Sequence, residues 1–133
     1  MAGTAHPDVA GAAAGCLGTE LVSSRVERLP DGELRPVLAA LPGDDVYVVQ
    51  PTGPPGNEYL VELLLLLDAC RRAGAGRLTA VVPCLVYARQ DRRTTPGEAV
   101  AARVVTNLIV VHKSRVTGTT VHATVRPGLQ VPA

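Results

Sequence analysis

The sequence predicts an α/β fold, a mostly parallel sheet flanked by helices. Residues 46–50 (VYVVQ) and 77–83 (RLTAVVP) are short β-branched runs typical of buried strands. The residues between them have the apolar periodicity of a helix. A strand, a helix and a strand at this spacing form a βαβ unit, which implies parallel strands and a right-handed crossover.

The composition fits one globular domain. The chain has 133 residues, of which 47% are hydrophobic, and it has no Phe and no Trp, so its core must be packed from Val, Leu and Ala. A net charge of +1 with mixed signs does not indicate a nucleic-acid or membrane partner. The longest purely apolar stretch, residues 63–67, is far too short to span a bilayer, and no basic segment precedes the Ala-rich run near the start. We therefore expect a cytoplasmic protein.

Two elements are expected before the βαβ unit. Residues 9–17 predict a short Ala-rich helix that ends at Gly18. Residues 21–29 alternate loosely between apolar and polar side chains, which predicts a half-exposed strand. The stretch LPDGE (29–33) follows, and its Pro-Asp-Gly is typical of a turn.

The central helix has the clearest signals in the sequence. Asn57 is expected to be its N-cap, and Gly74 is expected to end it. Acidic residues near its start and arginines near its end favour the helix dipole. Its apolar stripe is Leu60, Leu63, Leu64 and Leu67.

The chain after the βαβ unit begins with a long loop, residues 83–98. A further helix is expected from Glu98 to about Ile109. The following VVHKSRVTGTTVHATVRPG looks like a β-hairpin that turns at Thr117 and Gly118. No Gly, Pro or polar turn separates this helix from the hairpin.

The cysteines and histidines suggest no metal site. Cys16, Cys70 and Cys84 each lie in an apolar setting without a C-x-x-C pair, which predicts buried, reduced side chains. The three histidines are isolated, with no metal-ligand spacing. We expect no metal ligand from the protein.

Candidate binding residues follow the predicted strands or their turns. Ligands of parallel sheets gather beyond the carboxyl ends of the strands, here residues 51–57 and 83–98. In YARQDRR (87–93), three arginines, among them Arg89, together with Gln90 and Asp91 suit a polyanion, with guanidinium groups for phosphate oxygens and an amide for a base or ribose. In LPDGE, Asp31 and Glu33 could accept hydrogen bonds from an adenine amino group or a ribose hydroxyl. On composition alone, a solvated charge run and a plain surface turn are the favoured alternatives.

The last candidate is HKSR (112–115). Alternation along a strand places Lys113 and Arg115 on one face, where two cations could neutralise charge that develops on a transferring phosphate. A solvated edge strand is the alternative, and it too is favoured on composition alone.

Taken together, these stretches resemble the ribose-phosphate pyrophosphokinase (phosphoribosyl pyrophosphate, PRPP, synthetase) family. The resemblance covers nearly all of residues 17–109 and is carried by L-P-D-G-E, V-Q-P-T-x-x-P-x-N, E-L-L-L-x-x-D-A and Y-A-R-Q-D in the family's order. It implies an N-terminal-like domain over residues 1–109. Residues 110–133 resemble the hairpin of the family's C-terminal domain that carries a K-x-R pair.

The resemblance implies an activity and roles for matched residues. The family transfers diphosphate from ATP to ribose 5-phosphate with Mg²⁺, which gives PRPP and AMP. Asp31, Gly32 and Glu33 would then contact adenine, next to Leu29 where the family usually has Phe. Arg89, Gln90 and Asp91 would bind ATP, Lys113 would be the catalytic lysine, and Arg115 would be its partner. The family's nucleotide site lies between subunits, so a homo-oligomer or co-assembly with a full-length synthetase is expected.

Two family features have no counterpart in these 133 residues. They are the Asp-Leu-His metal motif after the last helix and the acidic loop that cradles the ribose phosphate. We therefore expect Mg²⁺ with ATP, without the histidine ligand of the family, and expect impaired turnover. The alternative is a non-catalytic subunit that associates with full-length synthetase and modulates it.

Overall fold

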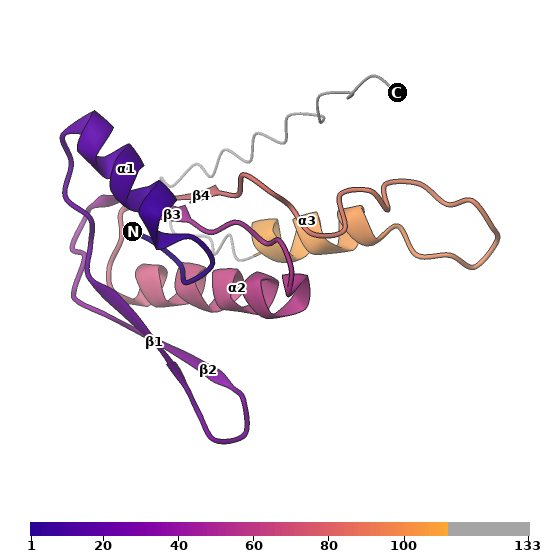
Figure 1. The fold of residues 1–133 in the computed structure, drawn as a ribbon, viewed down its shortest axis with the longest axis horizontal. Helices are drawn as coiled ribbons and strands as arrows, with labels where there is room; N and C mark the ends of the chain where they lie inside the picture. Colours follow the sequence, from indigo (N-terminus) through magenta and orange to yellow (C-terminus); the bar gives the residue numbers. More distant parts are fainter. Residues whose placement is uncertain (112–133) are drawn as a thin grey trace.

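The computed structural model describes residues 1–111. Three helices and four strands make up this part of the chain (Figure 1). In chain order they are α1 (Pro7–Leu17), β1 (Ser24–Arg28), β2 (Leu34–Leu38), β3 (Asp45–Val49), α2 (Gly56–Arg72), β4 (Arg77–Val81) and α3 (Ala101–Val111).

The predicted βαβ unit is present, and the α/β fold class is confirmed. Strands β3 and β4 are parallel, with Asp45 opposite Arg77 and Val49 opposite Val81. The opposite edge of β3 is occupied by the first residues of the chain, because Val49 bonds to the backbone of Met1 and Gly3. Among the described residues, β4 has no second strand partner. The four named strands thus form two separate two-stranded sheets, one parallel and one antiparallel, so the expected mostly parallel sheet is confirmed only in part.

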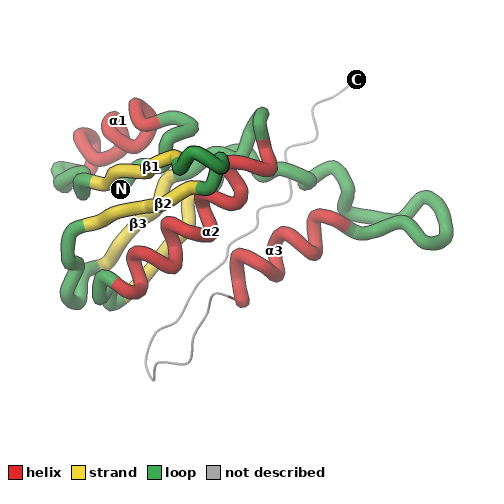
Figure 2. Tube along the Cα trace, turned by 90° about the horizontal axis from the view of Figure 1, so that it is seen from below, coloured by secondary structure: helices red, strands yellow, loops and turns green. Residues whose placement is uncertain are grey.

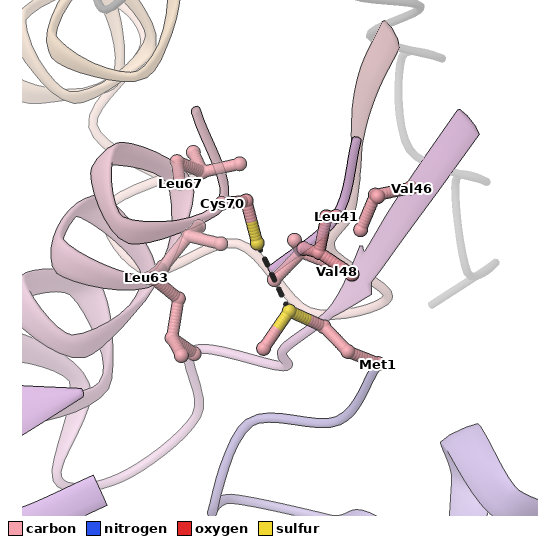
Figure 3. Packing of buried hydrophobic residues seen from close by; sticks show 8 residues of the cluster. Met1, Leu41, Val46, Val48, Leu63, Leu67 and Cys70 are labelled. Atoms are coloured by element: carbon pink, nitrogen blue, oxygen red, sulfur yellow. Dashed lines mark hydrogen bonds between the residues drawn. The ribbon is translucent and has the colours of Figure 1, made fainter. Parts of the chain in front are cut away.

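The hydrophobic core lies between α2 and the parallel strands (Figure 3). Leu63, Leu66, Cys70 and Val48 are fully buried there, and the Cys70 thiol lies 3.0 Å from the Met1 sulfur. Burial raises the pKa of the Cys70 thiol to about 11. Helix α3 lies next to α2 (Figure 2), and its Ile109 packs against the same core.

Strands β1 and β2 form an antiparallel hairpin that projects from the body (Figure 1). The predicted strand over residues 21–29 is confirmed as β1, whereas β2 is not expected from the sequence. Its run LRPVL has Pro36 at the centre, which lowers strand propensity but is tolerated at an edge. The β2 strand packs along α2, so one side of the hairpin is held by the body of the domain.

Helix boundaries differ from the prediction at several ends, and α1 begins at Pro7 instead of Val9. Helix α2 begins at Gly56 after Pro55 in the N-cap position, so Asn57 lies inside the first turn and does not cap it. The Asn57 side chain instead accepts a hydrogen bond from the Tyr87 hydroxyl. Leu66 is fully buried whereas Leu64 is only half-buried, which shifts the apolar stripe slightly.

Helix α3 begins at Ala101 instead of Glu98, because Glu98 is engaged in a turn. It continues to Val111, so the backbone at residues 110 and 111 is helical and does not begin a strand. The rest of the predicted hairpin lies outside the described residues.

The three cysteines are free, and the prediction of their burial is correct only for Cys70. Cys16 and Cys84 are exposed. Cys16 lies near the end of α1, a helix of which only Ala10 is buried, and Cys84 lies in the loop after β4. Apolar neighbours in the sequence therefore do not predict burial correctly at Cys16 and Cys84. Across residues 1–111, no helix is long and apolar enough to cross a membrane.

Candidate nucleotide-binding segments

The tip of the β1–β2 hairpin is a tight turn made by the LPDGE stretch. The Leu29 amide donates to the Glu33 carbonyl at 2.8 Å, and the Gly32 amide donates to the Leu29 carbonyl at 2.9 Å. Gly32 has φ +90°, a left-handed conformation that favours glycine. The Asp31 carboxylate accepts a hydrogen bond from the Glu33 amide at 3.1 Å, and the side chains of Asp31 and Glu33 are exposed. The predicted turn is therefore confirmed, with both carboxylates turned to solvent.

The hairpin stem carries its own ion pairs. Glu27 on β1 pairs with Arg25 and with Arg35 on β2. The hydrogen bond from Arg35, followed by the charges of both arginines, holds the pKa of Glu27 below its usual value. Arg28 at the end of β1 pairs with Glu58 in the first turn of α2. These ion pairs hold the stem of the hairpin, and none of them involves the tip residues Asp31 and Glu33.

The long loop after β4 is attached to the end of β3 through Thr52. The Thr52 side chain is 1% exposed, which is unusual for a polar residue in a loop. Its hydroxyl donates to the Cys84 carbonyl at 3.0 Å and accepts from the Val86 amide at 2.8 Å. Thr52 therefore joins the two loops that leave the carboxyl ends of the parallel strands.

The loop next reaches the first turn of α2 through Tyr87. Its hydroxyl donates to the side-chain oxygen of Asn57 at 2.6 Å. Tyr87 has φ +63°, which is uncommon for a residue other than glycine. The Tyr87 carbonyl accepts from the Gln90 amide at 2.9 Å, and the Gln90 carbonyl accepts from the Ala102 amide at 3.1 Å, which links the loop to α3.

The side chains of Arg89, Gln90 and Asp91 are exposed. Within residues 1–111 they make no side-chain hydrogen bond or ion pair, so their donors and acceptors are available to a ligand. Further along, the Glu98 carboxylate accepts hydrogen bonds from Thr94 and Thr95, and these bonds lower the pKa of Glu98. The backbone of the loop is thus held by hydrogen bonds at several points, whereas the side chains of Arg89, Gln90 and Asp91 have no bonded partner within residues 1–111.

Within one chain the two segments do not meet. The hairpin and the long loop leave the body in different directions (Figure 1), and no described hydrogen bond or ion pair joins their tips. Lys113 and Arg115 lie outside the described residues, so their expected roles remain predictions. In the part of the chain that the structure describes, no three His, Cys, Asp or Glu side chains come together as a metal site would require.

Sequence reasoning did not find the three residues that hold the long loop, namely Thr52, Asn57 and Tyr87. Thr52 had one usable signal, because it is a hydroxyl residue placed just after a buried strand. Asn57 lies where the sequence also predicts a helix N-cap. Nothing in the local sequence indicates Tyr87 as its partner, since 30 positions separate the two residues.

These features define an α/β domain that presents two polar segments, a hairpin tip and a loop beyond a parallel strand. Residues 1–112 match the model of the N-terminal domain of ribose phosphate pyrophosphokinase. The chain therefore belongs to the ribose-phosphate pyrophosphokinase family.

Individual relatives agree with this assignment. The chain is 46% identical over 110 residues to "Ribose-phosphate pyrophosphokinase 2, chloroplastic" of Spinacia oleracea, which covers 82% of this chain and 28% of the relative. It is 44% identical over 110 residues to the ribose-phosphate pyrophosphokinase of Maricaulis maris, which covers 82% of this chain and 36% of the relative.

The fold is similar to the crystal structure of phosphoribosylpyrophosphate synthetase from Mycobacterium smegmatis. The TM-score is 0.80 at 32% identity, over 85% of this chain and 38% of that one. The chain thus corresponds to about a third of the length of these proteins.

Proposed function

We propose that this chain supplies the nucleotide-binding segments of a ribose-phosphate diphosphokinase, which transfers diphosphate from ATP to ribose 5-phosphate to give PRPP and AMP. In this proposal Asp31, Gly32 and Glu33 contact the adenine. Arg89 binds phosphate oxygens through its guanidinium group, and Gln90 and Asp91 complete the contact with ATP.

The observation that carries the proposal is the arrangement of the two segments. Each presents exposed side chains from a well-supported backbone, and the two project from the body in different directions (Figure 1). One nucleotide bound by both kinds of segment would then take the hairpin tip from one subunit and the long loop from another. The proposal therefore includes a homo-oligomer, or co-assembly with full-length synthetase in the cytoplasm.

Turnover by the 133 residues alone is proposed to be low. Phosphoryl transfer depends on the positioning of both reactants and on electrostatic stabilisation. Lys113 and Arg115 are the candidate catalytic pair, but these 133 residues contain no family loop for the ribose phosphate. Mg²⁺ belongs to the proposal as the ion that accompanies ATP, because these 133 residues have no counterpart of the family's Asp-Leu-His metal motif.

The test is ATP binding by the purified chain, measured by titration calorimetry, together with AMP release in the presence of ribose 5-phosphate. Arg89→Ala should weaken ATP binding by roughly tenfold or more, since hydrogen bonds to charged groups contribute about 1.5–3 kcal/mol. Arg103→Ala removes the same charge from an exposed position on α3 and serves as the control. Equal effects of the two substitutions would contradict the proposed role of Arg89, and rapid AMP release would contradict low turnover.

A second candidate function is a non-catalytic subunit. The hairpin tip and the long loop do not meet within residues 1–111 of one chain (Figure 1), which favours a chain that works together with a second subunit. Mixing the chain with a full-length synthetase and measuring the mass of the product tests this idea. Absence of a mixed oligomer would rule against it, and altered PRPP synthesis in the mixture would support it.

A further inference from the structure

We infer that Tyr87 is a positioning residue, which holds the Arg89–Asp91 segment in its presented conformation through the hydrogen bond to Asn57. The identity of the ligand rests on the proposed function. The positioning role itself concerns only the conformation of the loop and can be tested without any ligand.

The first argument is the backbone at Tyr87. A residue other than glycine at φ +63° needs support from its surroundings, because an L side chain crowds the backbone in this region. The support at this position is the 2.6 Å hydrogen bond from the Tyr87 hydroxyl to Asn57. The bond spans two elements, and its acceptor lies on the long helix α2, which is a rigid base.

The second argument is the path from Tyr87 to the ligand-facing side chains. The Tyr87 carbonyl holds the Gln90 amide, and the Gln90 carbonyl holds the Ala102 amide at the start of α3. Arg89 lies inside this turn, and its own side chain contacts no described partner by hydrogen bond or ion pair. The direction in which Arg89 points is thus set by the backbone on either side of it.

The third argument is the order of the contacts between the two loops. Thr52 fixes Cys84 and Val86, and Val86 packs so closely on Gly56 that an added Cβ there would lie 2.4 Å from it. Tyr87 with Asn57 is the next contact along the chain and the last side-chain contact before Arg89. Loss of this contact should free the tip of the loop and leave its base attached.

The test uses the full chain and four variants. Tyr87→Phe removes only the hydroxyl, Asn57→Ala removes only the acceptor, and the double variant removes both. Asn57→Asp keeps an oxygen acceptor and is the conservative control. Amide hydrogen exchange is measured without nucleotide at Gln90, whose N–H is bonded to the Tyr87 carbonyl, and at Thr52 as the reference at the loop base.

Tyr87→Phe and Asn57→Ala should each speed exchange at Gln90 by about three- to tenfold, the effect of losing one ordinary hydrogen bond, with no change at Thr52. The double variant should match the single variants, and Asn57→Asp should match the wild type. ATP affinity should fall in the same variants by a similar factor. Unchanged exchange at Gln90 in Tyr87→Phe, or single effects that multiply in the double variant, would overturn the inference.

The two proposals can fail separately. If the wild type binds no ATP while exchange at Gln90 responds as expected, the proposed function fails and the positioning role stands. If ATP binds and Arg89→Ala weakens it while exchange at Gln90 is unaffected by Tyr87→Phe, the positioning role fails and the proposed function stands.

Discussion

Arg28 at the end of β1 forms an ion pair with Glu58 in the first turn of α2. The neighbouring residue Asn57 accepts the hydrogen bond from Tyr87 of the long loop. One turn of helix therefore holds both the hairpin and the loop, although these two projections do not touch each other.

Glu58→Gln should lower the free energy of unfolding by less than about 1 kcal/mol, because both partners are partly exposed and surface ion pairs are weak. The difference from the wild type should shrink further in high salt. Urea unfolding at low and high ionic strength measures it. A double-mutant cycle with Arg28→Met provides the control. If Glu58→Gln lowers the free energy of unfolding by the same amount in the Arg28→Met background, the ion pair is not the source of the loss.

Thr4→Ala should lower the free energy of unfolding by about 1–2 kcal/mol, since hydrogen bonds to charged groups are stronger than average. The Thr4 amide and hydroxyl donate to the two carboxylate oxygens of Glu62 at 2.6 and 2.5 Å, and Glu62 is 1% exposed. Thr4→Ser keeps the hydroxyl and should be close to the wild type. Thermal unfolding of the three proteins distinguishes the outcomes, and equal losses in Ser and Ala variants would contradict the role of this hydroxyl.

Gly56→Ala should cost about 1 kcal/mol or more, because the new methyl group would overlap the Val86 side chain and force a local shift. Gly53→Ala, in the loop just before α2, is the matched control, since an added Cβ there meets nothing within 4 Å. Its effect should lie within about 0.5 kcal/mol of zero. Urea unfolding compares the two, and equal stability would mean that the loops can separate at this point without cost.

The three thiols should differ in reactivity. Cys16 and Cys84 are exposed, whereas Cys70 is buried with a pKa of about 11 and so remains protonated at neutral pH. A chromogenic disulfide reagent at pH 8 should modify Cys16 and Cys84 quickly and Cys70 only as the protein unfolds. Mass mapping of the labelled peptides checks this, and early labelling of Cys70 would contradict the packing in Figure 3.

Asp68 should make stability depend on acid. The hydrogen bonds from Arg72 and Arg71 hold the pKa of Asp68 below its ordinary value of 3.8. The stabilisation is therefore complete above that value and is lost as the pH falls through the lower value in the folded protein. Asp68→Asn should be less stable than the wild type by about 0.5 kcal/mol at pH 7, and the difference should disappear near pH 2. A gap that is constant with pH would exclude this ion pair as the cause.

The sequence was sufficient wherever local pattern and tertiary structure agree. The leucine-rich helix α2 and strand β3 each bury apolar side chains on one face, so their sequence patterns located them. The run at residues 77–81 located β4 as a strand, but the expectation that this strand is buried is wrong, since none of its residues is buried. The turn at Asp31 and Gly32 was found in the same way, from local backbone chemistry. The family motifs add an expected contact between these elements and a nucleotide, which stays a prediction.

The missed features depend on contacts between distant residues. Strand β2 was not predicted because Pro36 lowers its strand propensity. Its strand conformation comes from its pairing with β1 and its packing on α2. Asn57 has a side chain that suits helix capping, but a tyrosine 30 positions away uses it. The exposure of Cys16 and Cys84 depends on whether distant parts of the chain pack over them, which the neighbouring residues in the sequence do not determine.

The attachment of the first residues also sets an order of folding. Met1, Thr4 and Ala5 bond to partners 46, 58 and 45 positions further along the chain. During synthesis these residues leave the ribosome before their partners, which follow only when β3 and α2 emerge. The β1–β2 hairpin needs only local pairing and can form earlier. Residues 1–5 should therefore be among the last of the described residues to reach their native place, where residues 1–3 bond along the edge of β3.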